Sequence, residues 1–233
     1  MAKRELIMGI DDAGRGPLIG PMILAGALLT REQEIILKKA GVKDSKQVLH
    51  PARIKLSKLI KDNSINYKVV KSFPDEIDKY VSTKGLNLNT LEARKAAEII
   101  NFLNDGKEKI NVVVDCPSVN PVAWKTKLLE FVKKSDNLEI MCEHKADINH
   151  ISASSASILA KVAREEEVEK IKKQIGINFG SGYPADPISK EFLKKHGNAL
   201  KDSGIFRKTW ATWKSLFPEK GKKQASLGIF NQK

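Results

Sequence analysis

Two adjacent carboxylates near the N-terminus are the residues of this chain best suited to chemistry. Asp11 and Asp12 follow an apolar segment, residues 6–10, and the triplet Gly14-Arg15-Gly16 comes shortly after them. Glycines let backbone amides approach a ligand without a Cβ in the way, and neighbouring carboxylates can hold a hard cation. The combination suits a phosphodiester, although a plain hairpin turn would use the same residue types.

Two more aspartates follow apolar or small-residue patterns elsewhere in the chain. Asp115 ends the apolar segment 110–115, and Asp147 precedes a run of small side chains at residues 152–157. Taken singly, Asp115 could terminate a strand and Asp147 could lead into a helix as a cap. Glu143 and His144 are rival ligands by position, and we interpret them as surface or supporting groups.

The sequence pattern around these acids predicts an α/β fold with a five-stranded mixed sheet flanked by helices, and these elements must position the acids. Strands are expected at residues 6–10, 22–30, 65–73, 110–115 and 138–142, and helices at residues 32–40, 52–61, 91–103, 124–134 and 158–175. A capping signal at residues 89–92 is expected to open the third of these helices. The first three strands should be antiparallel, and strands separated by helices should be parallel.

This topology predicts that the aspartates converge. If the first and fourth strands are neighbours, Asp11 and Asp115 come within about 5 Å at backbone level. Asp12 can join them only where its strand ends and twists, and Asp147 would approach from a third direction. Carboxylates packed this closely repel one another, and a divalent ion removes that penalty. Oxygen ligands without clustered Cys or His favour Mg²⁺ or Mn²⁺, and two such ions could support an in-line displacement.

Composition limits the classes of protein and partner. The 233 residues suffice for one substantial core with a small appended part, and no apolar run is long enough to span a membrane, so we expect a cytoplasmic protein. The net charge of +13, from 41 basic and 28 acidic residues, favours a polyanionic partner such as nucleic acid. A thermophile-type surface or a ribosome-associated protein would look similar. Cys116 and Cys142 are expected to be buried, reduced thiols.

The basic residues are concentrated near the C-terminus. Residues 190–233 contain 11 basic and 3 acidic side chains, which predicts a nucleic-acid clamp. We expect a catalytic domain at residues 1–176 and a helical, substrate-binding extension at residues 177–233. The polar triplet Asp44-Ser45-Lys46 lies in a predicted loop, where Ser45 could instead cap the helix that follows.

Several ordered blocks of the sequence resemble the ribonuclease HII family, the type 2 ribonucleases H, and most resemble its archaeal and eukaryotic branch. The resemblance runs from Gly9 to about Trp213, and its blocks are residues 11–17, 44–46, 113–115, 145–147, 155–162 and 180–184. It implies a ribonuclease H-like fold with a helical C-terminal extension. It also implies a metal-dependent endonuclease, expected to be monomeric, that cuts RNA in RNA/DNA hybrids.

The resemblance also implies a second substrate, duplex DNA that contains a ribonucleotide, cut on its 5′ side to leave 5′-phosphate and 3′-hydroxyl ends. Asp11, Asp12, Asp115 and Asp147 take the places of the four catalytic, metal-binding acids. Gly14, Arg15 and Gly16 match the segment that reads the 2′-hydroxyl, Tyr183 matches the tyrosine that packs on the sugar, and Lys46 looks like a phosphate contact. Tyr183 could also serve only to anchor its loop.

One residue departs from the family pattern. The second acid of the family is usually glutamate, and Asp12 is shorter by one methylene, which withdraws its carboxylate by roughly 1.5 Å and can weaken a second metal site. A hybrid-binding protein with impaired cleavage is therefore the alternative. A nucleotide-binding module is disfavoured because no P-loop lysine follows the glycines.

Overall fold

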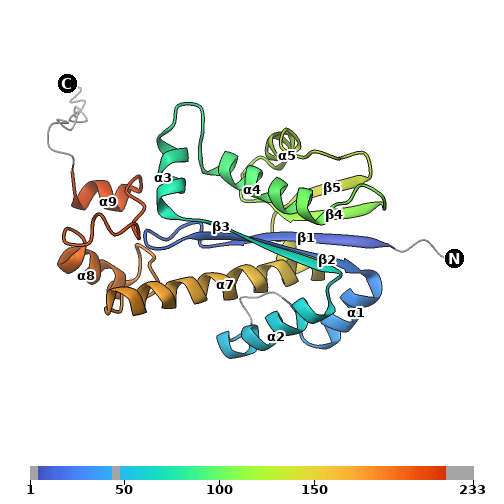
Figure 1. Cartoon of the computed structure of the whole chain (residues 1–233), viewed down its shortest axis with the longest axis horizontal. Coiled ribbons are helices and arrows are strands. Elements are labelled where there is room, and N and C mark those ends of the chain that lie inside the picture. The colour runs from blue at the N-terminus through green and yellow to red at the C-terminus, as the bar shows by residue number, and fades with distance from the viewer. Residues whose placement is uncertain (1–4, 44–47, 219–233) are drawn as a thin grey trace, which may run out of the picture.

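The structure, a computed structural model, describes residues 5–43 and 48–218. Its centre is a five-stranded sheet with the strand order β3-β2-β1-β4-β5 (Figure 1). The strands are β1 (Leu6–Ala13), β2 (Met22–Thr30), β3 (Asn66–Ser72), β4 (Ile110–Asp115) and β5 (Leu138–Glu143). The β1–β2 and β2–β3 pairs are antiparallel, whereas the β1–β4 and β4–β5 pairs are parallel. The predicted mixed sheet is confirmed.

Helices cover both faces of the sheet. On one face lie α1 (Arg31–Lys39), α2 (His50–Asn63) and α7 (Ile151–Ile175), and on the other lie α3 (Pro74–Ser82), α4 (Leu88–Leu103) and α5 (Pro121–Leu129) (Figure 1). Strand β2 contributes side chains to the cores on both faces of the sheet, because successive side chains of a strand point to opposite faces. Met22, Leu24 and Leu28 join the core beneath α4 and α5, and the intervening Ile23, Ala25, Ala27 and Leu29 join the core beneath α7.

Helices α4 and α2 both begin earlier than the sequence predicts. Helix α4 starts three residues earlier than expected because Asn87, rather than the signal at residues 89–92, caps it by accepting a hydrogen bond from the Thr90 amide at 2.9 Å. Helix α2 has Leu49 as its N-cap, with proline in its first turn. The proposed cap for α2 at Ser45 was wrong, and Ser45 itself lies outside the described residues.

Helix α5 begins at Pro121, three residues before the predicted start, and ends at Leu129, five residues before the predicted end. The backbone that follows is bound by Asn101 of α4 and by Asn104, the C-cap residue of α4, instead of continuing the helix. Asn101 donates to the Phe131 carbonyl at 2.9 Å and accepts from the Lys133 amide at 2.8 Å, and Asn104 donates to the Lys134 carbonyl at 2.9 Å. Helix α3, which the sequence analysis missed, begins at a proline directly after β3.

Helix α7 crosses the sheet in close contact with β1. It begins at Ile151, so the small residues 152–157 form its first turns. A Cβ built on Gly9 would lie only 2.0 Å from the Ser152 carbonyl carbon, which means that backbone lies against backbone at this point. Only glycine in the strand, opposite small residues in the helix, permits this approach.

The chain after α7 packs against the turn between β1 and β2. Helices α8 (Pro187–His196) and α9 (Ala211–Leu216) contribute to a third hydrophobic cluster, which includes Leu18 and Ile19 of that turn. Ile19 also forms an isolated antiparallel bridge with Phe206. The C-terminal segment therefore lies against the glycine-rich turn that follows the first two acids.

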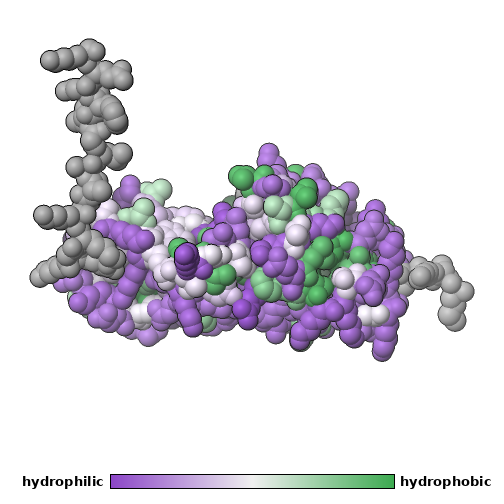
Figure 2. Space-filling view, turned by 90° about the horizontal axis from the view of Figure 1, so that it is seen from above, coloured by the Kyte–Doolittle hydropathy of each residue, from purple (hydrophilic) through white to green (hydrophobic). Residues whose placement is uncertain are grey.

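The surface above α4 and α5 is mostly hydrophilic, with apolar atoms gathered over part of it (Figure 2). Exposed apolar side chains on these helices include Phe102 of α4 and Val122 and Leu129 of α5. Of the described helices, none has the length and apolar character that crossing a membrane requires.

Candidate active site

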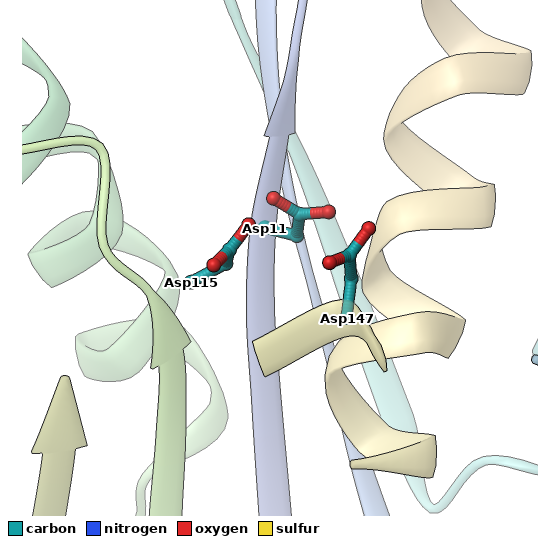
Figure 3. Close-up of side chains that lie close together, drawn as sticks. All are labelled: Asp11, Asp115 and Asp147. Atoms are coloured by element: carbon teal, nitrogen blue, oxygen red, sulfur yellow. The ribbon is translucent and has the colours of Figure 1, made fainter. Parts of the chain in front are cut away.

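Three carboxylates from separate elements meet at one end of the sheet. Strands β1 and β4 pair in parallel with Ile10 opposite Val114, so the next residue on each strand, Asp11 and Asp115, lie side by side. Asp147 arrives from α6 (Ala146–Asn149), a short helix between β5 and α7. One oxygen from each of these three aspartates lies within 4.8 Å of the others (Figure 3). The structure thus brings together three of the four acids chosen from the sequence.

A sharp turn directs Asp147 toward the strand ends. Lys145 has a left-handed backbone with φ of 61°, a conformation uncommon for a residue with a side chain, and it turns the chain from β5 into α6. The Ala146 amide then donates to Asp115 Oδ1 at 3.0 Å, and Ser154 Oγ donates to the Asp147 carbonyl at 2.5 Å. The turn is therefore held by one of the acids that it faces.

The electrostatics of the cluster favour a bound cation. The pKa of Asp11 is raised well above its usual value, chiefly by burial and then by the charges of Asp12 and Asp115. A side-chain hydrogen bond with Ser157 and one from the Asp12 amide oppose that rise. Asp147 is 2% exposed, and its Oδ1 has no hydrogen-bond partner among the described residues. A divalent ion would satisfy this buried oxygen and relieve the repulsion.

Asp12 lies beside the cluster and does not belong to it. Strand β1 continues to Ala13, with Asp12 opposite Leu24, so the expected end of the strand before Asp12 was wrong. Adjacent strand residues point to opposite faces, which separates Asp12 from Asp11. The pKa of Asp12 is raised to about 6, chiefly by burial and also by the charge of Asp115, although Arg15, Lys161 and Arg207 oppose the rise.

The acids line a pocket of about 440 Å³ together with most of the other residues chosen from the sequence. Gly14, Arg15, Gly16 and Tyr183 line it with all four aspartates. Tyr183 is 41% exposed, and a Cβ on Gly16 would lie 3.4 Å from its ring, so the aromatic ring stands beside the glycine turn. Lys46 lies outside the described residues. Glu143 and His144 are not in the three-aspartate group, and they bind His150 and the Cys116 carbonyl respectively.

Three basic side chains of the pocket were not among the site residues chosen from the sequence. Arg53 of α2 and Lys161 and Arg164 of α7 line it beside the acids. Lys161 donates to Ser157 Oγ at 3.0 Å, and Arg164 donates to the Ser181 carbonyl at 2.9 Å with its guanidinium 5.3 Å from the Tyr183 ring centroid. Lys161 belongs to a block shared with the family, and its four-residue spacing from Ser157 was the available signal, because such residues share a helix face.

The sheet order and the aspartate cluster define a ribonuclease H-like fold with an acidic centre suited to divalent metal. The family model for ribonuclease HII matches residues 8–213. A ribonuclease HII of Methanococcus maripaludis is 38% identical over 221 residues, covering 92% of this chain and 88% of the relative. One of Pyrococcus horikoshii is 36% identical and covers 96% and 98%. The chain belongs to the ribonuclease HII family.

Solved structures agree with this assignment. The crystal structure of the ribonuclease H2 from Pyrococcus horikoshii has a TM-score of 0.80 at 36% identity, covering 91% of this chain and 96% of the other. The PCNA:RNase HII complex from Archaeoglobus fulgidus gives 0.77 at 35% identity, covering 88% and 95%. The chain is therefore a type 2 ribonuclease H, a family of metal-dependent endonucleases that act on RNA/DNA hybrids.

Proposed function

We propose that the enzyme also cuts duplex DNA on the 5′ side of an embedded ribonucleotide, leaving 5′-phosphate and 3′-hydroxyl ends, as the first step of ribonucleotide removal. One observation carries this proposal: the Gly14–Gly16 turn and Tyr183 line the same pocket as the four aspartates. The 2′-hydroxyl distinguishes RNA from DNA at a single position, and rigid backbone amides can probe it closely. A sugar sensor next to the acids can place one chosen phosphodiester for cleavage.

We propose that Asp11, Asp115 and Asp147 hold Mg²⁺ or Mn²⁺, with Asp12 serving a second ion. The donor set fits, because it consists of carboxylate oxygens within 4.8 Å of one another and one of them is buried without a partner among the described residues. When bound, such ions supply an activated water and stabilise the charge on the leaving oxygen. The protein side chains orient the substrate: Arg15, Lys161 and Arg164 face its phosphates, and Lys46 is proposed to add another phosphate contact.

We further propose that residues 177–233 extend the substrate-binding surface of a catalytic domain at residues 1–176. Support comes from the third hydrophobic cluster, in which α8 and α9 pack against the β1–β2 turn, and from the excess of basic residues at 190–233. The extension would hold nucleic acid while the aspartates cut it.

A hybrid-binding protein with impaired cleavage is the second candidate, because Asp12 does not join the three-aspartate group. To separate the two, an RNA/DNA hybrid and a DNA duplex with one ribonucleotide are incubated with the parent, Asp12→Glu and Asp115→Asn in Mg²⁺ or Mn²⁺. The endonuclease proposal requires metal-dependent cleavage of both substrates by the parent and loss of cleavage in Asp115→Asn. Binding of both substrates by the parent without cleavage, restored in Asp12→Glu, would establish the second candidate.

A protein partner is suggested by the neighbour described as a PCNA:RNase HII complex. We propose that this chain binds PCNA through its last residues, a basic stretch that also contains Leu227, Ile229 and Phe230. Short segments with a few apolar anchors commonly dock into a hydrophobic groove of a partner. The double substitution Leu227→Ala and Phe230→Ala should abolish binding to Archaeoglobus fulgidus PCNA and leave cleavage of short substrates unchanged. Retained PCNA binding would refute this role.

A further inference from the structure

The side chain of Arg207 is fully buried and grips the glycine turn. Its Nη2 donates to the Gly14 carbonyl at 2.6 Å and its Nη1 to the Arg15 carbonyl at 2.8 Å. Nε and Nη2 also donate to the Gly20 carbonyl, at 3.1 and 3.0 Å. Burial lowers the pKa of Arg207 to about 10. Burying a guanidinium against carbonyl oxygens is costly, so this arrangement serves poorly as a device for stability alone.

The bonds to these carbonyls fix the direction of the amides in the same turn. In a planar trans peptide the carbonyl of one residue and the N–H of the next point to opposite sides. Because Arg207 holds the Gly14 and Arg15 carbonyls, the amides of Arg15 and Gly16 point away from it. In the described part of the chain, neither of these amides donates a hydrogen bond to the backbone, and both residues line the pocket of the aspartates.

A second side chain completes the grip. Trp210 Nε1 donates to the Gly16 carbonyl at 3.1 Å, and the Arg207 guanidinium stacks 5.0 Å from the centroid of the Trp210 ring. The segment carrying both residues is tied to α3, because Asp78 accepts from the Lys208 amide at 2.6 Å and the Thr209 amide at 3.0 Å. Arg207 and Trp210 thus bind all three successive carbonyls at residues 14–16.

We propose that Arg207, assisted by Trp210, is a positioning residue that aims the Arg15 and Gly16 amides at the 2′-hydroxyl and so sets the preference for ribonucleotides over deoxyribonucleotides. The inference rests on the proposed function and adds a determinant of specificity about 190 residues away in sequence. Arg207 touches the sensor and does not itself contact the reacting groups.

The test uses substitutions that differ in what they remove. Arg207→Lys keeps the charge but loses the planar fork, and Trp210→Phe removes one hydrogen bond while keeping the aromatic packing. Phe192→Leu is the matched control, because it loosens the third hydrophobic cluster without removing a hydrogen bond to the glycine turn. The ring centroids of Phe192 and Phe206 lie 6.2 Å apart in that cluster. All are made in the full chain, with thermal midpoints recorded. Two quantities are measured: hydrogen exchange of the peptide covering residues 14–16 in the free protein, and the affinity ratio of two duplexes.

The duplexes are one with a single ribonucleotide and its all-DNA counterpart, bound in the Asp115→Asn background so that they are not cut. Arg207→Lys should speed exchange of the Arg15 and Gly16 amides and lower the affinity ratio roughly tenfold or more, since small misplacements of a recognition group are expensive. Trp210→Phe should give a smaller loss, and Phe192→Leu should leave both quantities near the parent values despite a lower midpoint.

Two results would overturn the proposal. Unchanged exchange in Arg207→Lys and Trp210→Phe would show that the turn holds its shape without them. An equal loss of the affinity ratio in Phe192→Leu would show that the effect is one of general stability. If Arg207→Lys fails to fold, amide exchange and the affinity ratio of Trp210→Phe alone decide whether the proposal stands. A parent without preference for the ribonucleotide refutes the proposed function, whereas the exchange experiment still decides whether Arg207 orders the turn.

Discussion

Replacing Asp12 with asparagine should stabilise the metal-free protein, and the gain should grow with pH. The pKa of Asp12 is raised from 3.8 to about 6 in the folded chain, mainly by burial. A raised pKa means that the folded state prefers the protonated acid. The stability that this preference provides is fully present below pH 3.8 and is lost as the pH rises through about 6. Asparagine does not ionise, so the substituted protein escapes that loss.

The size of the effect follows from the two pKa values. Linkage makes the penalty from Asp12 about 0.6 kcal/mol at pH 4 and about 3 kcal/mol at pH 8. Because the side chain is only partly buried, solvent screening places the real gain below these figures. For a chain of this length, each kcal/mol corresponds to roughly 2–4 °C in the thermal midpoint.

The assay is urea or thermal unfolding of the parent and Asp12→Asn in EDTA at pH 4 and pH 8. Asp136→Asn is the control, because Asp136 is exposed and its replacement should change stability little at either pH. Added Mg²⁺ or Mn²⁺ should narrow the difference at pH 8 by neutralising the acids. An equal difference at both pH values, or a parent more stable than Asp12→Asn at pH 8 in EDTA, would refute the electrostatic reasoning.

Three other outcomes test separate parts of the molecule. Asp115→Asn should reduce cleavage roughly a hundredfold or more while hybrid binding persists, measured by gel assay and binding titration; near-parental cleavage would remove Asp115 from the centre. Gly9→Ala should destabilise the fold by about 3 kcal/mol or more in urea unfolding, because the added Cβ meets the Ser152 backbone at 2.0 Å; a tolerated alanine would mean that α7 can shift freely. Removing residues 219–233 should weaken hybrid binding more at low salt than at high salt, and replacing Lys220, Lys222 and Lys223 with alanine should reproduce that loss; a salt-independent loss would contradict the basic clamp.

The sequence was sufficient where local patterns decide the structure. The limits of β2 and β4 and the mixed pairing of the sheet could be predicted, because hydrophobic alternation and turn residues are properties of short segments. The approach of Asp11 and Asp115 followed from pairing β1 with β4. Helix α5 was predicted to end too late because its end depends on Asn101 of α4 and on Asn104, the residue that caps α4.

The parts that could not be predicted depend on distant residues. The orientation of Asp12 was decided by the continued pairing of β1 with β2 through Ala13, which no local signal revealed. Arg207 looked like one of many basic residues near the C-terminus, yet it binds a turn 193 positions earlier in the chain. A single sequence contains no record of which distant carbonyls a basic side chain will meet.

The contact between Gly9 and Ser152 also fixes where α7 lies along β1, and the two elements rise by different distances per residue. Both elements run in the same direction from it (Figure 1). A strand climbs about 3.3 Å per residue and a helix 1.5 Å, so two steps to Asp11 and five steps to Ser157 reach nearly the same height, roughly 7 Å. One residue inserted between Ser152 and Ser157 would rotate the helix by about 100° and present a different side chain to the acid. The loops of this enzyme can therefore accept insertions, but the segment of α7 between Ser152 and Ser157 cannot.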